Sequence, residues 1–111
     1  MRLNGAEFML SLAAKAGKVY SGETAVENAV KSGSACLVIV SADASDNTKK
    51  KFRDKCSYYE IPFYIYGTKE TIAHAIGRQM RSSVAVTDLS LAGQISKKLE
   101  EMSVHGENQD K

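Results

Sequence analysis

The sequence predicts an α/β fold in which a small mixed, largely parallel central sheet carries helices on both faces. Helical and strand-like segments alternate along the chain, and the continuous apolar run Cys36–Val40 is typical of a strand that is buried on both faces. A chain of 111 residues, 43% of them hydrophobic, also has the usual size of a single domain. Right-handed crossovers between parallel strands limit the topology further.

The first third of the chain predicts two helices and a short strand. Asn4 and Glu7 have the spacing of a capping box, so a helix is expected from there to about Lys15, and Gly17 ends it. A short edge strand over residues 18–20 and a second helix over residues 21–33 follow. The residues expected to face the core are Phe8, Met9, Leu12, Ala13 and Ala16 in the first helix and Ala25, Val26, Ala29 and Val30 in the second.

After the apolar run, the pattern predicts a polar loop and a lysine-rich helix capped by Asp46 or Asn47, with Phe52 and Cys56 turned inward. The basic side chains of this helix, from residue 49 to residue 55, form either a solvated face or a second electrostatic contact. Two further strands and two further helices complete the alternation, with strands expected over residues 61–66 and 83–87 and helices over 68–76 and 88–102.

Residues 1–102 are expected to form this single domain, and residues 103–111, which are almost without apolar side chains, a flexible tail. No apolar run approaches the roughly 20 residues of a membrane span, and the start of the chain lacks the pattern of a signal peptide. A cytoplasmic protein is therefore expected. Cys36 and Cys56 are too few for a disulfide framework and are expected to be free thiols.

The common signatures of enzymatic and metal sites are missing from the sequence. It contains no GxGxxG or GxxxxGK[ST] phosphate loop, no Cys-x-x-Cys or His-x-x-x-His pair, and no Gly-x-Ser-x-Gly elbow. We therefore expect no catalytic residue, no metal and no cofactor. One alternative is a receiver-like domain, in which Asp43 and Asp46 past the strand end handle Mg²⁺ and phosphate with Lys69. The competing interpretation makes the two aspartates loop and cap residues.

Four features taken in order carry a resemblance: Gly22 at a helix start, SGSACLVIVSADASDNTKKK from Ser32, the segment from Cys56 to Pro62, and GTKETIAHAIGRQMRSSVAV from Gly67. Together they resemble the kink-turn RNA-binding ribosomal-protein family of the L7Ae and L30e type, most closely its small bacterial members of the YlxQ type. The resemblance covers about residues 4 to 100. It implies a three-layer α/β/α sandwich that is not an enzyme and that binds structured RNA, either a kink-turn or ribosomal RNA, as a monomer associated with ribosomes or their assembly. Neither DNA nor a membrane is expected as a partner.

The resemblance also implies where RNA is bound, namely at the start of the second helix and in the loop before the last strand. A helix N-terminus offers free backbone amides to a phosphate or a base edge. In the loop, Met80 offers an apolar cushion to a base, between the phosphate-binding Arg78 and Arg81. The implied RNA-binding residues are Ser21, Gly22, Glu23, Thr24, Glu27, Asn28, Arg78, Gln79, Met80, Arg81 and Ser82.

The chain departs from the strongest form of the family pattern at the start of the second helix. That pattern has an Asn-Glu pair and a lysine four residues after the Asn, where this chain has Thr24, Ala25 and Asn28. A carboxylate that accepts from guanine would then have to come from Glu23 or Glu27. We expect weaker and more salt-sensitive binding than in the strongest members. A protein-interaction module that has lost RNA binding is a second alternative.

Overall fold

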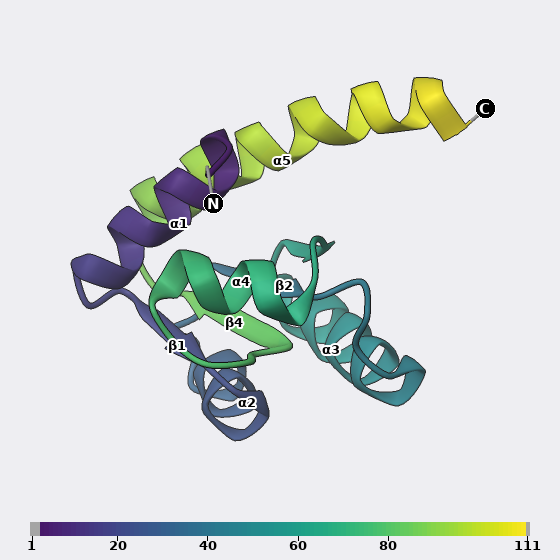
Figure 1. Cartoon of the computed structure of the whole chain (residues 1–111). Coiled ribbons are helices and arrows are strands. Elements are labelled where there is room, and N and C mark those ends of the chain that lie inside the picture. Colours follow the sequence, from purple (N-terminus) through teal and green to yellow (C-terminus); the bar gives the residue numbers. More distant parts are fainter. Residues whose placement is uncertain (1–2, 111) are drawn as a thin grey trace.

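The computed structural model describes the backbone of residues 3–110 and the side chains of residues 3–102. All the predicted helices and strands occur within this part of the chain (Figure 1). In order, they are α1 (Gly5–Lys15), β1 (Val19–Ser21), α2 (Glu23–Lys31), β2 (Leu37–Val40), α3 (Asp46–Tyr59), β3 (Phe63–Ile65), α4 (Lys69–Ile76), β4 (Ser83–Val86) and α5 (Leu89–Asp110). Helices α1, α4 and α5 cover one face of the sheet, and α2 and α3 cover the other. The three-layer α/β/α sandwich is therefore confirmed.

The sheet has the strand order β1-β4-β2-β3 and is mixed. Only the β2–β3 pairing is parallel, whereas β4 runs antiparallel to both of its neighbours, β1 and β2. The prediction of a mixed sheet is confirmed, but the expectation that its pairing is largely parallel needs correction. Strands β1, β2 and β3 do point the same way, as the alternation of helices and strands predicts.

The direction of β4 follows from the path of α4. Val40, at the end of β2, lies beside Ile65, where β3 ends, and beside Ser83, where β4 begins. The chain therefore returns to the same end of the sheet after α4, instead of crossing to the opposite end as a parallel connection requires. Alternation of helix and strand in a sequence does not reveal whether a connecting helix runs along the sheet or across it.

The core consists of two apolar clusters, one on each face of the sheet. Successive side chains of β2 alternate between them, because Leu37 and Ile39 contact α1, α4 and α5 while Val38 and Val40 contact α2 and α3. The first cluster contains Ala6, Leu10, Ala13, Leu37, Ile39, Ile72, Ala75, Ile76, Val84, Val86, Ala92, Ile95 and Leu99. The second contains Val26, Ala29, Val30, Ala35, Val38, Val40, Ala44, Phe52, Cys56 and Ala85. The predicted inward positions of Phe52 and Cys56 are confirmed.

Two local expectations were wrong. In α1, Phe8, Leu12 and Ala16 are exposed, and the helix buries Ala6 and Leu10 beside Ala13, which is buried as predicted. Apolar residues occur all around this helix, so their spacing does not select one face, and the small alanines allow close contact with α4 and α5. Helix α3 is capped by Ser45, whose hydroxyl accepts from the amide of Thr48, and not by Asp46 or Asn47.

The last helix continues through residues 103–110, the stretch expected to be a tail, and the flexibility of that stretch stays a prediction. Within residues 3–110, none of the helices has the length and apolar content needed to span a membrane.

Both cysteines are free thiols, as predicted. Burial raises the pKa of Cys56 to about 11, which keeps this thiol protonated and unreactive at neutral pH.

Candidate nucleic-acid interface

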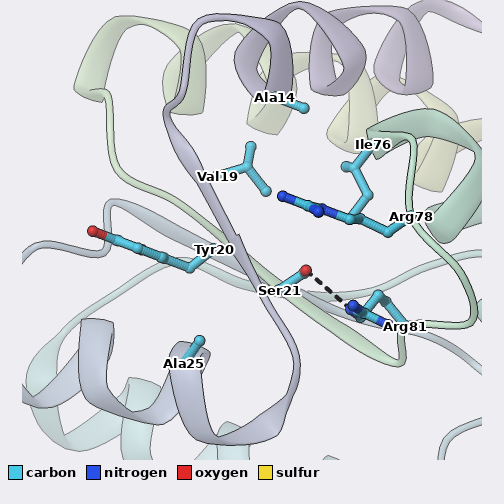
Figure 2. Close-up of a pocket in the computed structure, with 8 residues that line it drawn as sticks. All are labelled: Ala14, Val19, Tyr20, Ser21, Ala25, Ile76, Arg78 and Arg81. Atoms are coloured by element: carbon cyan, nitrogen blue, oxygen red, sulfur yellow. Dashed lines mark hydrogen bonds between the residues drawn. The ribbon is translucent and has the colours of Figure 1, made fainter.

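The two predicted RNA-binding segments are far apart in the sequence and adjacent in the fold. The pairing of β1 with β4 aligns Ser21 with Val84. The Nε of Arg81 donates to the Ser21 hydroxyl at 3.1 Å (Figure 2). The backbone amide of Gly22 donates to the carbonyl of Ser83, also at 3.1 Å. These bonds join the start of α2 and the loop before β4 (residues 78–82) into one surface.

The N-terminus of α2 is preceded by Gly22, which has φ 94° and ψ 151°. This backbone conformation is essentially restricted to glycine. Among the residues with described side chains, none caps α2, and apart from its two chain neighbours none has a heavy atom within 4 Å of the position that a Cβ at Gly22 would occupy. The first amides of the helix are therefore open to an acceptor from outside, and they carry the positive end of the helix dipole.

The loop before β4 is shaped by its own arginine. Besides Ser21, the guanidinium of Arg81 donates through Nη1 to the carbonyls of Gln79 and Met80. The side chain of Met80 is 62% exposed and therefore lies outside the core. Arg78 is also exposed. The loop thus presents an apolar side chain and a cation on a backbone that Arg81 stabilises from within.

A hollow of about 310 Å³, called here the arginine cleft, lies where the two segments meet. Figure 2 shows the side chain of Arg78 extending from the loop toward Val19, while Arg81 points to Ser21. The cleft is lined by Ala14, Val19, Tyr20, Ser21, Ala25, Ile76, Arg78 and Arg81. Its two guanidinium groups, beside a free helix N-terminus, suit it to bind a phosphate.

The carboxylate of Glu27 is turned away from this cleft and toward α3. It pairs with Lys51 at 2.8 Å, with Lys31 at 3.2 Å and with Lys55 at 3.4 Å. Hydrogen bonds from Lys51 and Lys31 lower the pKa of Glu27 to about 2. Lys51 also pairs with Glu23 at 3.0 Å. Both carboxylates that were candidates for reading guanine are thus already engaged by lysines, and part of the lysine-rich helix holds α3 against α2.

The remaining candidates at the start of α2, Thr24 and Asn28, are exposed. Neither side chain hydrogen-bonds to another residue in the part of the chain whose side chains are described. Asn28 borders a second hollow, which also includes Tyr20 and Ala25. The structure therefore brings Ser21, Arg78 and Arg81 together in the arginine cleft and leaves Thr24 and Asn28 on the adjoining surface of α2.

Asp43, the first aspartate of the receiver-like alternative, has a structural role. The carboxylate of Asp43 accepts from the backbone amide of Lys69 at 2.9 Å and so fixes the start of α4. The pKa of Asp43 is below its usual value, because the Ser41 hydroxyl and this amide stabilise the charged form. Among the residues with described side chains, no cluster of three or more His, Cys, Asp or Glu could hold a metal ion.

Sequence reasoning missed Tyr20, which lines both hollows and is 53% exposed. It was interpreted only as part of an edge strand. The signal that could have identified Tyr20 is its position in an edge strand that ends directly before Gly22. Successive side chains of a strand point to opposite faces of the sheet, so every second side chain of this strand points away from the cluster formed with α1, α4 and α5.

The sequence profile of the ribosomal protein L7Ae/L30e/S12e/Gadd45 family matches residues 6–95. The chain is 40% identical over 87 residues to RNA-binding protein YlxQ of Bacillus subtilis (strain 168), covering 78% of this chain and 87% of that one. It is also 40% identical over 70 residues to RNA-binding protein YlxQ of Enterococcus faecium, covering 63% and 68%.

Two solved structures share the fold. A protein of unknown function from Bacillus halodurans C superposes with a TM-score of 0.81 at 37% identity, covering 83% of this chain and 93% of that one. The Giardia lamblia 15.5kD RNA binding protein superposes with a TM-score of 0.74 at 20% identity, covering 86% and 84%. The relatives with a stated function are named as RNA-binding proteins and not as enzymes, in agreement with the expectation that this chain is not an enzyme. The chain belongs to the ribosomal protein L7Ae/L30e/S12e/Gadd45 family.

Proposed function

We propose that this chain is a non-enzymatic RNA-binding protein that recognises a kinked internal loop in a structured RNA. It acts as a cytoplasmic monomer in association with ribosomes or their assembly. The observation that carries the proposal is the joined surface, in which the uncapped start of α2 and the loop before β4 are tied by Arg81 to Ser21 and by Gly22 to Ser83. Family membership and the two YlxQ relatives support RNA as the class of ligand.

Binding by this surface selects a shape. The free amides at the start of α2 and the guanidinium of Arg78 attract phosphates, which positions the RNA without reading its sequence. Gly22 has no side chain, so the RNA backbone can approach the helix closely. A rigid surface of this kind binds a sharply bent RNA better than the extended conformer. The protein therefore shifts the RNA population toward the bent form.

The test is a titration of the protein into a labelled kink-turn RNA with tandem G·A pairs, beside the same duplex without its bulge, at two salt concentrations. A preference of about tenfold for the kinked RNA, or ~1.4 kcal/mol, is the expected result. Equal and strongly salt-dependent affinity for both RNAs would show general polyanion binding and refute shape recognition. Absence of binding to either RNA would refute the function and direct the search to a protein partner.

A charge-matched pair of variants tests the location of the surface. Arg78→Gln removes an exposed cation of the arginine cleft, and Lys97→Gln removes one from α5, on the opposite side of the sheet from α2 (Figure 1). Arg78→Gln is expected to weaken binding and to reduce the slope of log affinity against log salt by about 1. Lys97→Gln is expected to leave both unchanged. Equal effects of the two variants would refute the proposed face.

A further inference from the structure

A second hollow adjoins the arginine cleft and has a different chemical character. This hollow of about 330 Å³, called here the β1–α2 groove, is lined by Tyr20, Ala25, Asn28, Ala29, Ser32 and Ser34. It contains no charged side chain. Tyr20 and Ala25 line both hollows, so the groove lies directly beside the cleft.

Tyr20 is exposed because of its place in the sheet. The side chain of Val19 packs on the cluster formed with α1, α4 and α5, so the alternation of β1 directs Tyr20 to the opposite side, toward α2. There the methyl group of Ala25 forms part of the wall of the groove. Figure 2 shows Ala25 pointing from α2 toward the strand and the ring of Tyr20 projecting past the strand edge. The flat face of the Tyr20 ring therefore remains exposed, because the side chain that α2 places beside it, Ala25, is small.

The rim of the groove is polar and neutral. The side-chain amide of Asn28 is exposed and hydrogen-bonds to no other residue with described side chains. The hydroxyls of Ser32 and Ser34 lie 3.1 Å apart and complete the rim. The amide of Asn28 can donate and accept in the plane of a ring that lies on Tyr20, and the two hydroxyls, which donate to the carbonyl of Ala29, can accept there.

We propose that the β1–α2 groove binds one unpaired RNA base, with Tyr20 as the stacking surface and Asn28 as the hydrogen-bonding partner of the base edge. This inference rests on the proposed function and names the contact that adds base recognition to it. A base has an aromatic face for Tyr20 and a polar edge for Asn28, and its phosphate reaches the guanidinium groups of the adjoining cleft. Of the three positions that depart from the family pattern, Ala25 and Asn28 line this groove and Thr24 does not. Recognition there relies on stacking and a neutral amide in place of charged side chains.

The test uses a kinked RNA in which each unpaired base in turn is replaced by the fluorescent analogue 2-aminopurine. One analogue is expected to lose fluorescence on binding, because it stacks on Tyr20. Tyr20→Phe keeps the ring and is expected to keep the quenching and the affinity. Tyr20→Leu keeps an apolar side chain suited to a strand but loses the flat surface, so affinity is expected to fall about tenfold, or ~1.4 kcal/mol, with an unchanged salt slope.

Tyr58→Leu is the matched control, because Tyr58 is 80% exposed on α3 and lies outside both hollows. It is expected to change neither quenching nor affinity. Urea unfolding of each variant separates loss of a contact from loss of the fold. If the wild-type protein binds the kinked RNA and Tyr20→Leu binds it equally well, the groove inference is refuted and the proposed function stands. If Tyr20→Phe is as weak as Tyr20→Leu, the ring is not the contact. If the wild-type protein binds no RNA, both proposals fail.

Discussion

Replacement of Gly22 by alanine is expected to destabilise the protein through its backbone alone. At φ 94° and ψ 151°, Gly22 occupies a region that other residues adopt at a cost of about 1–3 kcal/mol. A Cβ at this position would have no heavy atom within 4 Å, so no steric clash adds to that cost. In urea, a loss of about 2 kcal/mol lowers the unfolding midpoint by about 1 M for a small domain.

The same substitution at Gly93 is the control, because Gly93 lies inside α5 with no positive φ and with equally open space around it. Gly93→Ala is expected to stabilise the protein by about 1 kcal/mol, since alanine is the better helix former. Equilibrium urea unfolding of the two variants and the wild-type protein should therefore give midpoints that move in opposite directions. A Gly22→Ala midpoint at or above that of the wild-type protein would refute the backbone argument.

Three further predictions concern other contacts. Ser45→Ala should lower the free energy of unfolding, measured in urea, by about 1 kcal/mol because α3 loses its cap, whereas Asn47→Ala should have little effect. A larger loss in Asn47→Ala than in Ser45→Ala would show that the cap is the residue predicted from the sequence. Glu27→Gln should be less stable than the wild-type protein at pH 7. The folded-state pKa of Glu27, about 2, is below the ordinary 4.5, so the stabilisation from its ion pairs is fully present above pH 4.5. The melting temperatures of the variant and the wild-type protein should therefore converge as the pH falls toward 2. Tyr66→Phe should lower the free energy of unfolding by ~1–2 kcal/mol, because it removes the Tyr66 hydroxyl, which donates to the Glu7 carboxylate at 2.6 Å. Burial and this carboxylate raise the pKa of Tyr66 to about 12, so the contribution should be complete below pH 10 and disappear toward pH 12 in an alkaline titration.

Much of the fold could be predicted because its signals are local. The apolar run of β2 predicted a strand buried on both faces, and Asn4 with Glu7 predicted the capping box that the structure shows. The burial of Phe52 and Cys56 followed from their spacing by one helical turn. Each of these features depends on residues within a few positions of one another, so periodicity and capping rules can detect them.

The features that could not be predicted depend on long-range contacts. Whether β4 runs parallel or antiparallel depends on how α4 lies on the sheet, and no short segment encodes that. The pairing of Glu27 with Lys51 requires α2 and α3 to be adjacent. At the candidate interface, the resemblance supplied both segments, but the hydrogen bond between Arg81 and Ser21 and the open position of Tyr20 appear only when β1 and β4 are paired.

The central position of β4 sets when this protein can fold during its own synthesis. β4 is the last strand to leave the ribosome, yet it separates β1 from β2 in the sheet. At about 5–20 residues per second, both earlier strands keep an unpaired edge for several seconds after they emerge. A nascent or truncated chain that ends before Ser83 therefore presents strand edges that are prone to aggregate. The surface that joins Gly22 to Ser83 likewise forms only after β4 has been synthesised, so an unfinished chain lacks the surface that we propose binds RNA.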